Sequence, residues 1–224
     1  MGEVQEAVNN FNGFTYWWSE PAWTGTEEQS EQNRICLANQ LLTVGWDGGY
    51  ITKYEQVPWT VEAVAGLYGN INKEDPRWNP GQYQSGVTNP EKGYGLVQWT
   101  PATKYQNWVA EQGLGNNWQM ENQCYRLGME VNKDYGQWYV RPQSPYKYSF
   151  YEYIQKTDEP EELAKAFYWN YEYSAAEDPT NRPQLARKWY NWLIENMDKI
   201  KPDQPHPTKS QFNWIYYLRR RRYG

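Results

Sequence analysis

One stretch of small and apolar residues constrains the fold of this chain more than any other. Apolar side chains recur at helical spacing between residues 61 and 71, where Val, Ala, Tyr and Ile stand three or four positions apart. Gly66 and Gly69 lie within this stretch, although each glycine costs a helix roughly 1 kcal/mol. We interpret both as points of close packing, and we expect a buried central helix that starts at Thr60 and ends at Glu74, before Pro76.

Further helices are predicted on both sides of this one. Thr26 and Gln29 form a capping box for a helix that reaches about residue 43. Thr100-Pro101 starts another, which ends near residue 112. Apolar periodicity predicts the remaining helices at about 117–132, 158–172 and 184–199, and a short strand at 96–99. The pattern predicts one mainly α, α+β domain over residues 26–200.

The two ends of the chain do not show this periodicity. Residues 1–25 are expected to be an irregular arm, with aromatic side chains that dock onto another surface. Residues 201–210 are rich in proline and predict a semi-rigid linker. Residues 211–224 form an aromatic tail that contains four consecutive arginines. We expect this tail to dock onto a neighbouring protein; contact with an anionic membrane is the alternative.

Composition narrows the classes of partner. The 224 residues include 14 Trp and 21 Tyr but only 5 Phe, and Asn and Gln are abundant. Rings with a polar atom, together with amides, suit a sugar polymer or a wet protein interface equally well. The net charge of −5 argues against a nucleic-acid partner held by phosphate contacts. No apolar run is long enough to span a membrane.

The chain offers little for metal or cofactor chemistry. Its single histidine, His206, stands between two prolines, and no CxxC motif occurs, so no metal site and no cofactor are expected. Cys36 and Cys124 permit one disulfide, but buried free thiols are the favoured interpretation. The acidic N-terminus lacks the apolar run of a signal peptide.

Glu74 is the strongest candidate for a catalytic residue. It stands at the C-terminal end of the central helix, where the helix dipole favours a neutral carboxylic acid. Tyr68 and Trp78 flank it in the sequence. An acid that retains its proton near neutral pH suits the general acid of a glycosidase. The alternative is an ordinary solvated glutamate at a helix end.

The spacing of several motifs carries a resemblance to a known family. The motifs are Gly69-Asn70, Glu74, Asn79-Pro80-Gly81, the run Gly93-Tyr94-Gly95-Leu96-Val97-Gln98-Trp99-Thr100-Pro101, and a closing segment from Leu163 to Glu172. Together they resemble the phage tail lysozyme family over about residues 30–195. The chain is similar more distantly to lytic transglycosylases and goose-type lysozymes.

The resemblance implies a lysozyme-like fold, in which a helical lobe and a small β element flank a glycan groove. It implies Glu74 as general acid at the bond between N-acetylmuramic acid and N-acetylglucosamine. The residues expected to bind substrate are Tyr94, Gly95, Gln98, Tyr171 and Trp78. Asp75, Glu91 and Glu172 are candidates for a second carboxylate, and a solvated position in a loop is the favoured interpretation of Glu91. Asp75 replaces the serine that many relatives carry, so hydrolysis and transglycosylation both remain open.

The resemblance also implies a biological setting. The expected substrate is bacterial peptidoglycan, and the expected location is the tail of a virion, with both terminal segments bound to other tail proteins. Two alternatives stay open at this point. One is an endolysin that acts at host lysis, and the other is a non-catalytic tail protein that keeps the lysozyme shape for structure or wall binding.

Overall fold

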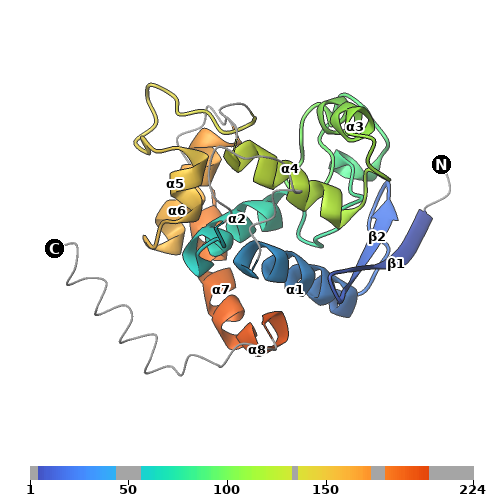
Figure 1. Ribbon diagram of the computed structural model, residues 1–224, viewed down its shortest axis with the longest axis horizontal. Helices are drawn as coiled ribbons and strands as arrows, with labels where there is room; N and C mark the ends of the chain where they lie inside the picture. The colour runs from blue at the N-terminus through green and yellow to red at the C-terminus, as the bar shows by residue number, and fades with distance from the viewer. Residues whose placement is uncertain (1–4, 44–56, 133–135, 173–179, 202–224) are drawn as a thin grey trace.

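The computed structural model describes residues 5–43, 57–132, 136–172 and 180–201, and these ranges form a mainly helical molecule with small β elements (Figure 1). The predicted tail, almost all of the predicted linker, and residues 44–56 between the first two helices lie outside the described residues. The elements are β1 (Gln5–Phe11), β2 (Phe14–Glu20), α1 (Glu27–Thr43), α2 (Val61–Glu74), η1 (Gln84–Gly86), α3 (Ala102–Glu111), α4 (Met120–Asn132), α5 (Phe150–Ile154), α6 (Pro160–Asn170), α7 (Arg182–Glu195) and α8 (Met197–Ile200).

Helix α2 is the centre of the fold, as predicted. The Thr60 hydroxyl accepts a hydrogen bond from the backbone N–H of Ala63 at 3.2 Å, which starts the helix. Every residue from 63 to 71 is buried, so α2 is covered on all sides rather than on one face. Its main neighbours are α7 and α6, and Figure 1 shows it surrounded by these helices and α1.

The two glycines of α2 explain how close these neighbours come. A Cβ atom at Gly66 would lie 2.9 Å from the backbone carbon of Leu163 on α6. A Cβ atom at Gly69 would lie 2.6 Å from the carbonyl oxygen of Arg182 on α7. Neither distance is tolerable against backbone, so the prediction of close packing at both glycines is confirmed. This packing brings the first residue of α7 beside the last turns of α2.

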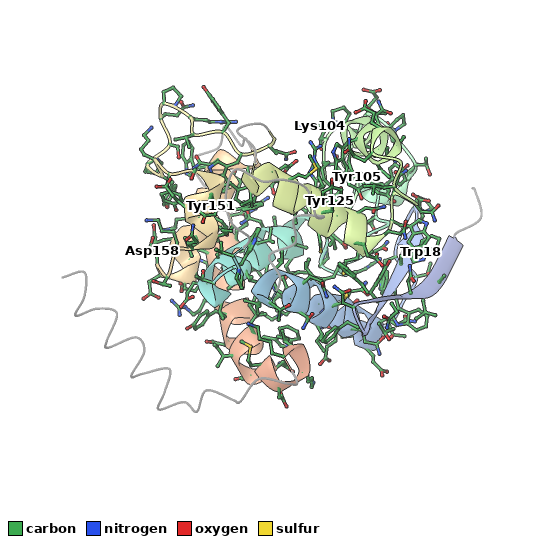
Figure 2. The ribbon with its side chains drawn as sticks, viewed as in Figure 1. Trp18, Lys104, Tyr105, Tyr125, Tyr151 and Asp158 are labelled. Carbon is green, nitrogen blue, oxygen red and sulfur yellow. The ribbon has the colours of Figure 1, made fainter. Side chains whose placement is uncertain are left out.

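The N-terminal arm is a β-hairpin, so the prediction of irregular structure is wrong for residues 5–20. Strands β1 and β2 pair antiparallel and are joined at Asn12-Gly13, both with positive φ (50° and 87°). An Asn-Gly pair of this kind favours a two-residue hairpin turn. Tyr16 and Trp18 of β2 are buried against the core, and Figure 2 shows Trp18 on this hairpin. The arm's aromatic residues therefore pack on their own domain.

Of three further helix starts, one agrees with the prediction and two differ from it. The capping box of Thr26 and Gln29 is present, with both hydrogen bonds formed. By contrast, α6 begins with Glu159 as its N-cap and Pro160 in its first turn, not with Asp158. The short helix α5 was not predicted; a capping box of Ser149 and Glu152 starts it.

Candidate active site

The turn after α2 is held by the side chain of Asp75. The backbone N–H of Asp75 donates to the carbonyl of Ile71 at 2.7 Å and ends the helix. Its carboxylate accepts hydrogen bonds from the backbone N–H groups of Arg77 at 3.1 Å and Asn79 at 2.5 Å. Asp75 is 2% exposed, and this burial raises its pKa to about 6, although the backbone hydrogen bonds oppose the shift. Both carboxylate oxygens are thus engaged in shaping the turn.

The N-terminal hairpin supports the same turn from behind. Asn79 exchanges two hydrogen bonds with the backbone of Ser19 on β2, at 3.0 and 2.6 Å. Asn33 on α1 donates to the carbonyls of Trp17 and Trp78, at 2.8 Å each. These amides satisfy backbone groups in the interior. The hairpin is therefore an integral support of the segment that follows Glu74.

Glu74 lies opposite an arginine. Its carboxylate forms an ion pair with the guanidinium of Arg182, the first residue of α7. The Arg182 side chain is only 7% exposed, whereas that of Glu74 is 27% exposed. A second guanidinium nitrogen donates to the Thr180 hydroxyl at 3.1 Å, and the group lies 4.7 Å above the ring of Tyr168. Glu74 thus keeps access to solvent while a buried cation faces it.

The aromatic residues expected around Glu74 lie in the core instead. Tyr68 and Trp78 are both 0% exposed and pack against each other with ring centroids 4.3 Å apart. The Tyr68 hydroxyl donates to the carbonyl of Arg34 at 2.6 Å. The expected sugar contact of Trp78 is not available in this structure, because its indole is enclosed by protein on both faces.

Glu172 is brought next to Glu74 by the end of α6. It follows directly after the helix and its C-cap, and it is partly buried. Burial raises the pKa of Glu172 to about 8; the negative charge of Glu74 adds to this rise, and Arg182 opposes it. A carboxyl group in this state is protonated at neutral pH. Of the candidates for a second carboxylate, Glu172 is the one that interacts with Glu74, while Asp75 turns toward the backbone and Glu91 is exposed on a loop.

The run from Gly93 to Trp99 forms a tight hairpin turn, not the predicted strand. Tyr94 and Trp99 exchange backbone hydrogen bonds at 3.2 and 3.0 Å, and residues 95–98 form the loop between them. Gly95 and Gln98 have positive φ, at 78° and 51°. The Gln98 amide donates to the carbonyl of Gly95 at 2.7 Å, which closes the loop. Gln98 is 7% exposed, and its Oε1 atom has no donor among the described residues.

Gly95 is required by close packing as well as by its φ. A Cβ atom there would lie 2.8 Å from the side-chain oxygen of Gln123 on α4. The same Gln123 oxygen accepts the backbone N–H of Leu96 at 2.9 Å. The glycine therefore lets α4 hold the loop, which is a structural reason for its place in the motif.

Tyr94 is enclosed in the aromatic interior. It is 0% exposed and packs against Tyr83 and Tyr105 at centroid distances of 4.7 and 6.0 Å. Burial raises the pKa of the nearby Glu20, and the Tyr94 hydroxyl opposes part of this rise. Contact between the Tyr94 ring and a sugar, as expected from the motif, is not available in this structure.

Tyr171 belongs to a buried polar network that the sequence did not indicate. Its hydroxyl donates to Oε2 of Glu130 at 2.6 Å. Oε1 of Glu130 accepts from Nε of Arg126 at 2.7 Å and from the indole N–H of Trp99 at 3.3 Å. The Glu130 side chain is 1% exposed and Tyr171 is 0% exposed. Tyr171 thus connects the residue before Glu172 to the 93–99 hairpin, and it does not face solvent.

Three charged residues of this region were not predicted from the sequence. Arg126 and Glu130 stand at i and i+4 of α4, a spacing that favours an ion pair and was available as a signal. Arg182 gave no local signal, because its partner Glu74 lies far away in the sequence.

Among the described residues, no group of three or more His, Cys, Asp and Glu side chains is placed to bind a metal ion. Cys36 and Cys124 are both buried free thiols. The described helices include none that is both long and apolar enough to cross a bilayer.

The fold and these motifs define a lysozyme-like protein. The sequence matches the phage tail lysozyme family over residues 53–193, and the chain belongs to that family. It is also 36% identical over 136 residues to Morphogenesis protein 1 of Bacillus phage B103. That alignment covers 60% of this chain and 35% of the relative, so the chain spans about a third of the relative's length.

Proposed function

We propose that this protein is a glycosidase of bacterial peptidoglycan that cleaves the β-1,4 bond between N-acetylmuramic acid and N-acetylglucosamine. The observation that carries the proposal is the pair of neighbouring carboxyl groups, Glu74 and Glu172, in a chain of the phage tail lysozyme family. Most glycosidases cleave the glycosidic bond with two carboxyl groups that flank it. The family and the phage relative support an enzyme carried on the virion that opens the wall at entry.

In the proposed mechanism, the two carboxyl groups act as one unit that holds a single proton. In the free protein the proton resides on Glu172, whose pKa is raised to about 8. The proton moves from Glu172 to the more exposed Glu74 carboxylate, which delivers it to the glycosidic oxygen, so that the C–O bond breaks and the oxygen leaves as a hydroxyl. The pair then carries two negative charges, which stabilise the positive charge that develops on the sugar ring. A water molecule or the sugar's own hydroxyl then forms the new bond to the ring carbon, and the proton that it loses returns to the carboxyl pair.

The first test is cleavage of purified peptidoglycan by the full chain and by Glu74→Gln, Glu172→Gln and Glu91→Gln. Glu91 lies on an exposed loop and is the matched control. We expect Glu74→Gln to lower the rate about 100-fold or more, since general acid catalysis contributes about that much. The control should keep the rate of the wild type. Equal rates for Glu74→Gln and the wild type would refute the role of Glu74.

Mass spectrometry of the released fragments tests the type of reaction. Reducing ends identify a hydrolase, and anhydro sugar ends identify a lytic transglycosylase. If the wild-type protein binds peptidoglycan but releases no fragments, the protein is a structural or wall-binding component and the proposed activity is wrong.

A further inference from the structure

We propose that Arg182 is the positioning residue of this site: it fixes the Glu74 carboxylate and supplies a positive charge to both Glu74 and Glu172. This inference rests on the proposed function, because it assigns a role in the protonation of the same two carboxyl groups. It concerns a residue that touches neither the reacting bond nor, at 7% side-chain exposure, an open surface.

The position of the Arg182 guanidinium is fixed from three directions. One nitrogen pairs with Glu74, another donates to the Thr180 hydroxyl at 3.1 Å, and the plane lies 4.7 Å above the Tyr168 ring. The Thr180 hydroxyl and the Tyr168 ring hold the guanidinium in place, so it loses little further freedom when it pairs with the Glu74 carboxylate. The cation is therefore preorganised toward Glu74.

The backbone of Arg182 is fixed as well. Its carbonyl oxygen lies so close to Gly69 that a Cβ atom there would approach to 2.6 Å. Gly69 precedes Glu74 on the same helix by five residues. The contact between α2 and α7 thus sets the distance between the helix that carries the carboxylate and the helix that carries the cation.

The charged groups around Glu74 and Glu172 favour a state in which one of the two carboxyl groups is protonated and the other is ionised. On α2, Lys73 is exposed, and Asp75 turns away toward backbone N–H groups. At the end of α6 stands Glu172, and at the start of α7 stands Arg182. On α7, Arg187 is engaged with Glu159 and Glu161, and Lys188 lies over the ring of Trp189.

Glu172 therefore faces one carboxylate and one cation, and these are the charged groups that act on its pKa. Two ionised carboxylates against one guanidinium would leave an uncompensated negative charge in a partly buried place. One ionised and one protonated carboxyl group give a neutral set. Without the cation, a second proton binds more readily and the first is released at higher pH.

The experiment compares Arg182→Gln and Arg182→Lys with the wild type over pH 4 to 10. The rate of peptidoglycan cleavage should form a bell-shaped profile for the wild type. Arg182→Gln should lower the maximum about tenfold and move both limbs to higher pH by about one unit, the size typical of a lost ion pair. Arg182→Lys keeps the charge, so its limbs should stay within about half a unit of the wild type while its maximum falls.

A second measurement does not depend on activity. Carbon-13 NMR of the glutamate carboxyl groups should give a midpoint near 8 for Glu172 in the wild type and a higher midpoint in Arg182→Gln. Lys188→Gln, an exposed residue on the same helix, is the matched control and should change neither profile nor midpoint. Thermal unfolding checks that each variant is folded; if Arg182→Gln is not, Thr180→Ala replaces it. That variant loosens the guanidinium but keeps its charge, so the maximum should fall and the limbs should stay.

Two outcomes would overturn the inference: unchanged limbs and an unchanged Glu172 midpoint in folded Arg182→Gln, or limbs that move in Thr180→Ala. If Arg182 has a purely structural role, Arg182→Gln should lower the maximum and leave the pH limbs and the Glu172 midpoint in place. Failure of the proposed function is a separate result. If the wild type cleaves no peptidoglycan, the NMR midpoint still decides whether Arg182 controls the protonation of Glu172.

Discussion

The two regions that carry the family motifs are built in opposite ways. At the junction of α2, α6 and α7, the carboxyl groups of Glu74 and Glu172 keep some exposure and face a buried cation. In the hairpin of residues 93–99, the motif side chains are almost completely buried, and the Leu96 backbone N–H and the Trp99 indole N–H donate hydrogen bonds to α4. A recognisable motif therefore marks either chemistry or shape. In this chain the hairpin provides shape, and we propose that the exposed helix ends carry the chemistry.

The comparison predicts that substitutions in the two regions separate stability from activity. Changes around the buried Glu130 should lower stability first and activity as a consequence. Changes in the carboxyl pair should lower activity while stability is kept or even increased. Four substitutions test this difference, in order of expected size.

Glu130→Ala should have the largest effect on stability. It leaves Arg126 buried without its carboxylate and removes the acceptor of Trp99 and Tyr171. Breaking a buried ion pair on one side costs about 3–5 kcal/mol of unfolding free energy. Urea denaturation at pH 7 measures this change, with Glu91→Ala as an exposed control that should stay within about 0.5 kcal/mol. A loss below that of the control would show that the network does not support the hairpin.

Gly69→Ala should destabilise the protein by about 2 kcal/mol, since the added methyl overlaps the Arg182 carbonyl at 2.6 Å. Because the clash pushes α7 away from α2, the rate of peptidoglycan cleavage should fall in protein that is still folded. Gly113→Ala is a useful comparison, because a Cβ atom there meets nothing within 4 Å and only its positive φ is strained. Full activity in folded Gly69→Ala would break the link between helix packing and the site.

Tyr171→Phe distinguishes a substrate contact from a structural one. The phenyl ring keeps the packing and removes the hydrogen bond to Glu130, which costs about 1.5 kcal/mol or somewhat more. The substrate concentration at half-maximal rate should not change, because the hydroxyl is buried. If the substrate concentration at half-maximal rate rises and stability does not fall, Tyr171 contacts the substrate and the structural interpretation is wrong.

Glu172→Gln should alter the pH dependence of stability. The folded pKa is about 8, and an unfolded glutamate has a pKa of about 4.3, so between these values only the folded state holds the proton. Wild-type stability should therefore fall as pH rises through this window, by at most about 1.4 kcal/mol per pH unit. The glutamine variant should lack this slope between pH 7 and 8, above most of the range in which Asp75 titrates. Melting temperatures at each pH measure the slope, and an equal slope in both proteins would contradict a protonated Glu172.

Local signals predicted most of the helical scaffold. The side chains of Thr26, Gln29 and Thr60 form the caps they were expected to form, and Pro76 follows the end of α2. The hairpin of residues 5–20 was within reach of the same kind of reasoning, since Asn12-Gly13 is a strong turn signal. It was missed because an aromatic arm near a terminus was interpreted as a docking segment for another protein.

The sequence by itself determined where helices start and stop, which glycines need close neighbours, and that Glu74 stands at the end of the central helix. These features depend on residues a few positions apart, whose preferences act before the chain is packed. Tertiary structure alone decided that Arg182 faces Glu74, that burial raises the pKa of Glu172, and that Tyr171 turns inward to Glu130. Each depends on burial and on charges brought together across the chain, because the strength of an electrostatic interaction is set by distance and solvent exclusion in the folded molecule.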